Sequence, residues 1–341
     1  MGYDVTIGIP VFKSVDYIRQ SIESALNQTY DSIEFLIIDD GGQDGSMDVI
    51  ARFQKIHSRG QDIHIISHQK NLGVSVSRNE IIEKAQGDFL YFMDSDDVIA
   101  ENTIELLMEN ALQYDAEIVF GSYEKIETSG ERVLYQYPSL QLLEKDALAC
   151  FAYRKYAGIQ ASACNYLVKT ALLRENNLYF IDTDYWEDLV FTFDLVTLVS
   201  RAVLLPNITY SYICRANSLS HYQQRINISK DEVMRNVESI NHLKATSSAL
   251  CAKEYYPYRC FNIAMTNFYI ACYILKRRKT IVPKVTNREI KSIMRHPASW
   301  HQICSFRQCR LKNMIIYLVG KLPSRLCITV IFFVGKVKRL V

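Results

Sequence analysis

Residues 89–97 read Phe89-Leu90-Tyr91-Phe92-Met93-Asp94-Ser95-Asp96-Asp97. The apolar run predicts a strand that is buried on both faces, with a group of acids directly after it. Asp94 and Asp96 emerge together at the end of this strand and repel each other unless a cation is present. Oxygen ligands of this kind suit Mg²⁺ or Mn²⁺. A simpler alternative is that Ser95, Asp96 and Asp97 only cap the following helix.

Short apolar runs alternate with longer helical patterns on both sides of this stretch. The expected strands are residues 5–10, 33–39, 63–67, 89–93 and 116–120, and the expected helices are residues 17–26, 47–56, 74–85 and 104–114. Strands that alternate with helices in this way predict an α/β fold, with a Rossmann-like, mostly parallel central sheet between flanking helices. Ligands of such sheets bind outside the carboxyl ends of the strands.

Two more polar turns follow the first two expected strands. The first is Pro10-Val11-Phe12-Lys13, and the second is Asp39-Asp40-Gly41-Gly42. A carboxylate at the second turn can accept a hydrogen bond from the N3–H group of uracil or from ribose hydroxyls. The glycine pair would let the backbone approach a ligand closely, although an ordinary tight turn would also explain it.

Composition excludes a mainly disordered chain, because 49% of the 341 residues are apolar and 22% are charged. The net charge of +2 hides an asymmetry. From Lys276 onward the last 66 residues carry 16 basic side chains and one acid, Glu289, whereas the first 275 carry 23 basic and 36 acidic ones. The nine cysteines form no C-x-x-C pair, and no signal-like segment precedes the first strand, so we expect a reduced, cytosolic protein.

The C-terminal part is both basic and apolar. Residues 314–335 are strongly apolar but are interrupted by Lys321, Pro323 and Arg325. Each apolar run is shorter than the ~18 residues that span a bilayer, so we expect a surface-lying segment attracted to anionic lipid. The alternative is a helix that packs on the protein. A nucleic-acid partner is not expected, because the interleaved residues are aliphatic rather than stacking aromatics.

Several blocks occur in order along the chain. They are Thr6-Ile7-Gly8-Ile9-Pro10-Val11-Phe12, Ser21-Ile22-Glu23-Ser24-Ala25-Leu26-Asn27-Gln28-Thr29-Tyr30, Glu34-Phe35-Leu36-Ile37-Ile38-Asp39-Asp40-Gly41-Gly42, Asn71-Leu72-Gly73-Val74-Ser75-Val76-Ser77-Arg78-Asn79, residues 85–97 and Trp186-Glu187-Asp188. Together they resemble the family 2 inverting glycosyltransferases of the GT-A fold, of the bacterial polysaccharide type. The match is dense over residues 1–97 and sparse to about residue 220. Lys13, where the family often has Asn, and Gly42, where it commonly has Ser, depart from the pattern.

The resemblance implies a nucleotide-diphosphosugar donor, most often a UDP-sugar, and it assigns roles residue by residue. The base would be held by Pro10, Val11, Phe12 and Asp40. The nucleotide pocket would be supported by Asp39, Asn71 and Arg78. The ribose, the phosphates and an Mn²⁺ or Mg²⁺ ion would be met by Asp94, Ser95 and Asp96, with Asp94 and Asp96 as the metal ligands.

Glu187 and Asp188 are the expected catalytic residues, with Asp188 as the general base. A carboxylate near the acceptor hydroxyl can take its proton as the glycosidic bond forms, and a single in-line attack inverts the anomeric centre. The alternative is that both acids only complement the dipole of a helix over residues 189–199. Arg215 is a further candidate for contact with the diphosphate, and His221 for contact with acceptor or metal.

The expected organisation is a GT-A domain over residues 1–220, a helical extension over 221–280 and a basic, apolar membrane-associating segment over 281–341. Within the first domain, residues 1–120 would bind the nucleotide-sugar and 121–220 would face the acceptor, a glycan or lipid-linked saccharide. We expect a cytoplasmic protein, peripheral on the inner face of the cell membrane. The competing interpretation is a catalytically silent scaffold of a polysaccharide assembly complex. Neither a G-x-G-x-x-G fingerprint nor a P-loop occurs, which disfavours dinucleotide oxidoreductases and P-loop enzymes.

Overall fold

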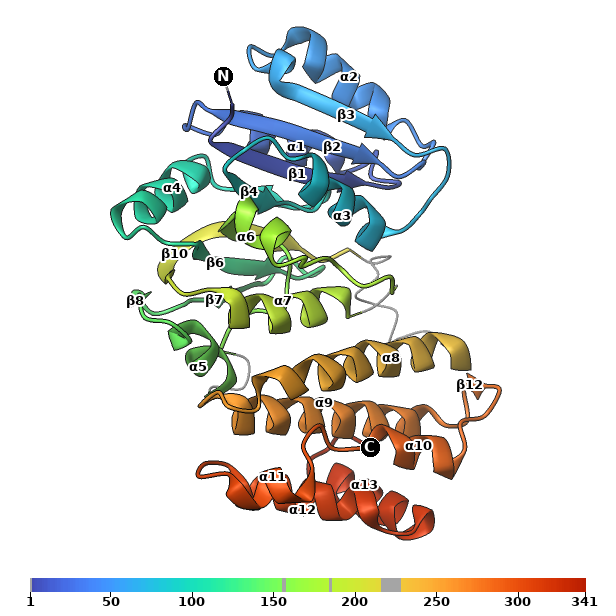
Figure 1. Cartoon of the computed structure of the whole chain (residues 1–341). Helices are drawn as coiled ribbons and strands as arrows, with labels where there is room; N and C mark the ends of the chain where they lie inside the picture. Colours follow the sequence, from blue (N-terminus) through green and yellow to red (C-terminus); the bar gives the residue numbers. More distant parts are fainter. Residues whose placement is uncertain (1, 155–157, 184–185, 216–227) are drawn as a thin grey trace. The chain divides into compact units, whose positions relative to one another are not determined.

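The computed structural model describes residues 2–154, 158–183, 186–215 and 228–341 (Figure 1). The chain forms two compact units. The first consists of Met1–Leu148, Ala161–Asp182 and Asp194–His221. The second consists of Ala149–Gln160, Thr183–Phe193 and Tyr222–Val341.

The first unit is built on one sheet with the strand order β3-β2-β1-β4-β9-β6-β10-β5 (Figure 1). Its strands are β1 (Val5–Val11), β2 (Ile33–Asp39), β3 (Ile63–Ser67), β4 (Phe89–Phe92), β5 (Val98–Ile99), β6 (Ile118–Ile126), β9 (Tyr166–Lys169) and β10 (Ala202–Ile213), with β7 (Arg132–Tyr135) on β6 and β8 (Leu140–Leu142) on β10. The run β3-β2-β1-β4 is parallel, as are β6 and β10. The predicted α/β class is confirmed, but β9 enters antiparallel between β4 and β6 and makes the sheet mixed.

Helices connect the parallel strands of this unit. They are α1 (Ile18–Leu26), α2 (Ser46–Ile56), the short η1 (Gly60–Asp62), α3 (Val74–Lys84), α4 (Thr103–Gln113) and α6 (Thr170–Glu175), while α5 (Ala147–Arg154) and α7 (Glu187–Leu198) each run from one unit into the other. The expected helices therefore form within one or two residues of their predicted ends. In α1 the buried residues include Ile18, Ile22 and Ala25, the spacing of one helix face turned to the sheet.

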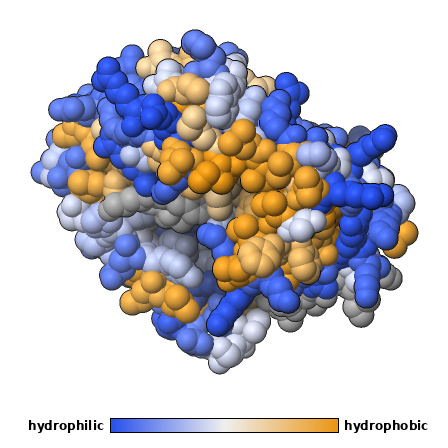
Figure 2. Space-filling model, turned by 90° about the horizontal axis from the view of Figure 1, so that it is seen from below, coloured by the Kyte–Doolittle hydropathy of each residue, from blue (hydrophilic) through white to orange (hydrophobic). Residues whose placement is uncertain are grey.

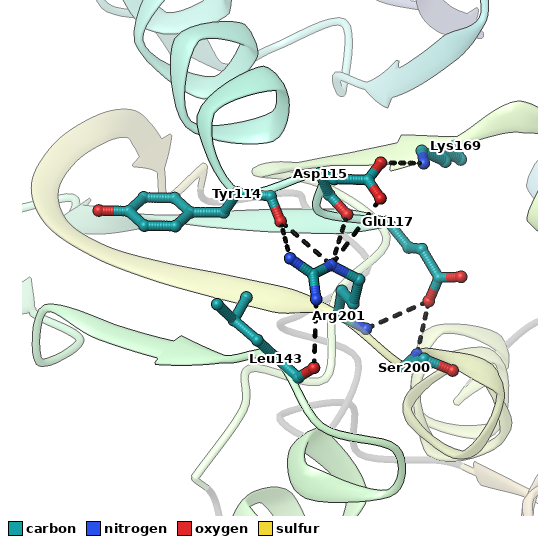
Figure 3. Close-up of polar contacts among 7 residues, drawn as sticks. All are labelled: Tyr114, Asp115, Glu117, Leu143, Lys169, Ser200 and Arg201. Atoms are coloured by element: carbon teal, nitrogen blue, oxygen red, sulfur yellow. Dashed lines mark hydrogen bonds and ion pairs between the residues drawn. The ribbon is translucent and has the colours of Figure 1, made fainter.

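A polar network joins the start of β10 to the segment between α4 and β6 (Figure 3). Arg201 donates from Nε to the carbonyls of Tyr114 and Asp115, at 3.1 and 3.0 Å. The carboxylate of Glu117 accepts from the backbone N–H groups of Ser200 and Arg201. These contacts give hydrogen-bond partners to backbone groups of both segments. They hold the starts of β6 and β10 next to each other.

The second unit is helical. It contains α8 (Lys230–Ser247), η3 (Ser248–Leu250), α9 (Tyr256–Arg277), α10 (Asn287–Ile293), α11 (Trp300–Ser305), α12 (Arg310–Lys321) and α13 (Ser324–Val337), with a short parallel pair of β11 (Ile228–Ser229) and β12 (Ile281–Val282). α8 and α9 lie side by side (Figure 1). The predicted helical, basic C-terminal extension is thus present in this unit.

A fully buried arginine anchors α9. Arg259 donates to the hydroxyl of Ser247 at 2.8 Å and to the carbonyl of Phe193 at 2.8 Å, and it also contacts the hydroxyl of Tyr153. A buried guanidinium is costly unless its N–H groups are satisfied, and here several acceptors meet it. Arg259 therefore fixes α9 against α5 and the first turns of α7.

The last two helices are packed on one side only. The buried residues of α13 are Cys327, Ile331 and Gly335, which form a single i, i+4, i+8 stripe. α12 buries Asn313, whose amide donates to the carbonyl of Pro257 at 3.0 Å. Met314 and Tyr317 of the same helix pack against a buried cluster that includes Tyr256, while Leu311, Ile315 and Leu318 are exposed. Among the helices that the structure describes, none is long and apolar enough to cross a membrane.

Candidate active site

The ends of β1, β2 and β4 meet at one edge of the first sheet. Val11 pairs with Asp39, and the backbone N–H of Asp40 donates to the carbonyl of Val11 at 2.9 Å. On the other side of β1, the N–H of Met93 donates to the carbonyl of Gly8 at 3.1 Å. The three polar turns identified in the sequence are therefore neighbours in space.

Two glycines allow three loops to approach one another. A Cβ on Gly42 would lie 2.7 Å from the backbone nitrogen of Lys13, and one on Gly41 would lie 2.9 Å from the backbone carbon of Lys70. Both contacts would be with backbone atoms, which cannot rotate away as a side chain can. A residue larger than glycine at either position would therefore push the loops apart. Lys13 itself has φ of 51°, a left-handed conformation that Asn adopts more readily than Lys. Beside it, the Phe12 ring is 41% exposed and available to stack on a planar ligand.

The two adjacent acids at the end of β2 have different surroundings. Asp40 is buried, and its carboxylate accepts from the backbone N–H groups of Leu72 and Gly73, at 2.7 and 2.9 Å. Asp39 is partly exposed, and among the described residues its carboxylate accepts one local bond, from the N–H of Gly41 at 3.0 Å. Asp40 thus holds the loop that presents Asn71, whereas Asp39 has carboxylate surface open to a ligand.

His68 completes the attachment of this loop. Its Nδ1 lies 2.7 Å from Asp40, and its Nε2 lies 2.7 Å from Glu80 on α3. Burial on its own would lower the pKa of His68, but the hydrogen bonds to the two carboxylates outweigh burial and raise this pKa. The His68 ring between the two carboxylates therefore fixes the loop to α3.

The turn after β4 is held from several sides. Arg78, buried in α3, donates to the carboxylate of Asp94 at 3.0 Å. The hydroxyls of Ser14 and Ser95 lie 2.6 Å apart, which ties this turn to the turn after β1. Four of the predicted pocket residues, namely Asp94, Ser95, Asp96 and Arg78, are therefore brought together by β4 and α3.

Burial raises the pKa values of the next two acids in this turn, Asp96 and Asp97. Burial first, and then the charge of Asp94, raises the pKa of Asp96 to about 6, although Arg215 acts in the opposite direction. Burial and the charges of Asp94 and Asp96 raise the pKa of Asp97 to about 8. Asp97 nevertheless has partners, since Tyr210 donates from its hydroxyl at 2.8 Å and Ile213 from its backbone N–H at 2.8 Å.

Arg215 reaches the same turn from the end of β10. It donates to the carbonyl of Asp96 at 2.7 Å, and its guanidinium lies 4.0 Å from the ring centroid of Tyr17. Its Nε is buried without a hydrogen-bond partner among the described residues. The guanidinium thus stands beside the acids, where it could also meet a phosphate. The other late candidate, His221, lies outside the described residues.

The donor set of this turn fits a divalent cation that takes only part of its ligands from the protein. Arg78 pairs with Asp94, and Tyr210 pairs with Asp97. Asp96 is left as the acid whose carboxylate accepts from no other residue in the described ranges, and a cation would relieve the cost of ionising it. The described residues contain no group of three or more potential metal-binding side chains, so the remaining ligands would come from substrate phosphates and water.

Glu187 and Asp188 form the first turn of α7 and belong to the second unit. Both side chains are half-buried. Trp186, directly before them, has φ of 69°, which is a strained conformation for a bulky residue. Its carbonyl accepts from the N–H of Val190 at 3.1 Å, so the strained residue sets the start of this helix.

Three residues of the first site escaped the sequence analysis. Asp97 and Tyr210 form a buried pair beneath the carboxylate turn, and His68 secures the loop before Asn71. Asp97 was considered only as a capping residue. The contacts of Tyr210 and His68 could not be predicted, because each contact joins residues that are distant in the chain.

The mixed sheet and its connecting helices define a fold class, the GT-A fold. A family model described as glycosyl transferase family 2 matches residues 6–167. The part of the chain that carries the three polar turns therefore matches glycosyltransferase family 2.

Relatives and solved structures agree with this assignment. The chain is 28% identical over 227 residues to a cholesterol galactosyltransferase of Borreliella burgdorferi, covering 64% of this chain and 62% of that protein. It is 24% identical over 234 residues to the glycosyltransferase GlyG of Streptococcus pneumoniae, covering 67% of this chain and 77% of that protein. A crystal structure of S. aureus TarS residues 1–349 with UDP-GlcNAc shares the fold, with a TM-score of 0.64, 16% identity, and coverage of 93% of this chain and 90% of that one.

Proposed function

We propose that this protein is an inverting, metal-assisted glycosyltransferase that moves a sugar from a UDP-sugar to a hydroxyl of a glycan or lipid-linked saccharide. The observation that carries the proposal is the meeting of three polar strand ends, with Phe12, Asp39 and the Asp94–Asp96 turn at one sheet edge. The similarity of fold to a protein crystallised with UDP-GlcNAc supports a uracil nucleotide. In this proposal residues 1–120 bind the donor and residues 121–220 face the acceptor.

The nucleotide would be recognised by the turns after β1 and β2. The exposed Phe12 ring can stack on the base, and the open oxygen of Asp39 can accept from the N3–H group of uracil. Pro10 and Val11 shape the strand end beneath the ring. Asp40 contributes by holding the loop that carries Asn71, through its bonds to Leu72 and Gly73.

Asp96 and Asp94 would hold Mn²⁺ or Mg²⁺, which when bound stabilises the charge that builds on the departing diphosphate. Arg78 orients Asp94 through their 3.0 Å contact. Arg215, beside Asp96, supplies a second positive charge for the phosphates.

In the proposed reaction the acceptor oxygen bonds to the anomeric carbon while the bond from that carbon to the UDP oxygen breaks. Asp188 takes the proton of the acceptor hydroxyl, and UDP leaves with the bonding electron pair. One displacement inverts the configuration. Asp188 lies half-buried in the first turn of α7. Glu187 would assist as the neighbouring acid.

We also propose that α12 and α13 attach the protein to an anionic membrane surface, on the cytoplasmic side. On α12 the exposed apolar residues are Leu311, Ile315 and Leu318, an i, i+4, i+7 stripe. Phe332, Phe333 and Val337 are exposed on α13. Figure 2 shows apolar side chains gathered into a patch on the face of the second unit, with hydrophilic side chains around it.

The polarity of α12 supports this attachment. The outer face of a helix on a water-exposed surface is usually polar. α12 packs Met314 and Tyr317 inward but also exposes a second apolar stripe of Leu311, Ile315 and Leu318. The basic excess of the last 66 residues supplies attraction to anionic lipid, at about 1 kcal/mol for each basic residue near the surface. An anionic bilayer thus complements both the apolar patch and its charged surroundings.

Nucleotide binding tests the first proposal. By calorimetry with Mn²⁺, UDP should bind at least about tenfold more tightly than CDP, because cytosine lacks the N3–H donor that Asp39 would accept. Equal binding of UDP and CDP would contradict the assignment of Asp39 and of the uracil nucleotide.

Vesicle flotation tests the attachment. The protein should float with vesicles that contain phosphatidylglycerol and should float poorly with pure phosphatidylcholine. Phe333→Glu should weaken flotation by about tenfold or more, since burying a phenylalanine stabilises by about 1.5–3 kcal/mol. Ile56→Glu is the matched control, because Ile56 is 80% exposed on α2, away from the patch. Equal flotation of both variants and the unmodified protein would refute the proposal.

A further inference from the structure

The second unit contains a pocket that the proposed donor site does not use. Its volume is about 350 Å³, and its walls come from α8, α9, the end of α13 and Trp186. Three cationic side chains line it, namely Lys276, Arg277 and Arg339. No carboxylate is among the lining residues in the described part of the chain. The pocket is therefore suited to an anion.

A buried amide oxygen also lines the pocket. Asn236, on α8, is only 5% exposed, and its Oδ1 has no hydrogen-bond partner among the described residues. A buried acceptor without a partner destabilises a fold by about 1–3 kcal/mol, so such a group calls for a donor from a ligand. Phosphate oxygens do not donate, but a sugar hydroxyl does. The pocket thus combines sites for an anion and for a hydroxyl.

One of the three cationic residues, Arg339, lies in the turn that follows α13. Arg339 has φ of 56° in the turn that closes the helix, where the N–H of Leu340 donates to the carbonyl of Gly335 at 2.8 Å. Glycine is the usual residue at such a position, because other residues adopt the left-handed conformation at a cost. The side chain of Arg339 lines the pocket.

Trp186 links the pocket to the predicted general base. It lines the pocket, and the next two residues are Glu187 and Asp188 at the start of α7. Its φ of 69° is also left-handed, which is exceptional for a large aromatic residue. A molecule bound in the pocket would therefore lie beside the backbone that carries Asp188.

We propose that this pocket binds the phosphate of a glycosyl phosphate acceptor, which rests on the function proposed above. Lys276 and Arg339 would pair with the phosphate, since neither forms an ion pair within the described ranges of the chain. Asn236 would accept from a hydroxyl of the attached sugar, and the Tyr269 ring would cover that sugar. The phosphate would thus orient the acceptor hydroxyl with respect to Asp188. The same chemistry could come from a free sugar phosphate or from a lipid-linked one.

Direct binding to the full-length protein tests this inference. By calorimetry, glucose 1-phosphate should bind and methyl glucoside should not, and added salt should weaken the binding. If farnesyl phosphate binds more tightly than glucose 1-phosphate, the acceptor is lipid-linked, and if it binds more weakly, the acceptor is a free sugar phosphate. Absence of binding by every phosphate probe would overturn the proposal.

Variants separate binding from folding. Lys276→Gln should weaken binding of glucose 1-phosphate about tenfold, whereas Lys279→Gln, an exposed lysine just beyond the same helix, should not change it. Arg339→Gly should weaken binding while leaving the unfolding temperature unchanged or higher, because glycine favours the φ observed there. Unchanged binding in Lys276→Gln and Arg339→Gly would overturn the proposal.

Donor hydrolysis distinguishes failure of this inference from failure of the proposed function, because UDP release from a UDP-sugar needs no acceptor. If the unmodified protein releases UDP but binds no phosphate probe, only the acceptor assignment is wrong. If it binds the probes but neither binds UDP nor releases it, the proposed transferase function is wrong.

Discussion

The adjacent acids Asp39 and Asp40 should differ in how much the same chemical change lowers the stability of the fold. In Asp40→Asn, an amide replaces a buried carboxylate that accepts from Leu72, Gly73 and His68 at 2.7–2.9 Å. Leu72 and His68 both donate to Oδ1 of Asp40, and Gly73 donates to Oδ2. If the single oxygen of the new amide keeps the bonds to Leu72 and His68, the N–H₂ group of that amide must face the N–H of Gly73. One charge-assisted bond is lost, and a donor is buried against a donor.

The expected destabilisation follows from these contacts. A hydrogen bond to a charged group contributes about 1.5–3 kcal/mol, and the buried donor adds to this loss, so Asp40→Asn should cost about 3 kcal/mol. For a domain of this size the unfolding temperature should fall by about 6–12 °C, at about 2–4 °C per kcal/mol. UDP affinity should fall as well, because the loop that presents Asn71 is no longer held.

Asp39→Asn is the matched variant. Its local bond from the N–H of Gly41 can be kept by the amide oxygen, so stability should change by less than about 0.5 kcal/mol. UDP affinity should nevertheless fall about tenfold to a hundredfold, since a charge-assisted bond to the uracil N3–H is lost. Calorimetry for UDP and thermal unfolding of both variants measure the two effects. Unchanged stability in Asp40→Asn, or unchanged UDP affinity in Asp39→Asn, would refute this division of roles.

Three further predictions concern the same sites. The folded-state pKa of His68 is raised above its ordinary value of 6.5, so its contribution to stability is present below that pH and is lost as pH rises through the folded-state pKa. Thermal unfolding should therefore show a larger difference between the unmodified protein and His68→Asn at pH 6 than at pH 9, and equal differences would contradict the contact with Asp40 and Glu80. Asp188→Asn should lower transfer by at least about a hundredfold while leaving UDP affinity within about twofold, as expected for a lost general base; an equal loss of both would indicate a structural role, and Glu187→Gln is the matched comparison. Asp96→Asn should abolish the increase in UDP affinity that Mn²⁺ produces in calorimetry, and a retained increase would exclude Asp96 as a metal ligand.

Much of the first unit was predictable because its strands are continuous apolar runs and its helices repeat apolar residues at helical spacing. The strands at 33–39 and 63–67 form as predicted. The strand β9 was not predictable, since Tyr166–Lys169 is a short run within an irregular region. Its place depends on pairing with Tyr91 and Val119, which are far away in the sequence.

In the candidate site, too, the sequence predicts which residues lie near one another but not the contacts that each side chain makes. The acids that follow β2 and β4 could be identified from sequence, because parallel strands bring their carboxyl ends together. Which of Asp39 and Asp40 is buried could not be identified, because the answer depends on the N–H groups of residues 72 and 73. The inward position of Asn313 likewise depends on its contact with Pro257 and cannot be read from the apolar character of its helix.

The most direct test of the account is release of UDP by the purified protein from a panel of UDP-sugars, with Mn²⁺ or Mg²⁺ and again with a chelator. The account predicts release from one sugar, dependent on the ion and lost in Asp96→Asn, because slow donor hydrolysis requires only the first-unit site and water. No release from any UDP-sugar, together with no binding of UDP, would contradict the account and would favour the silent scaffold.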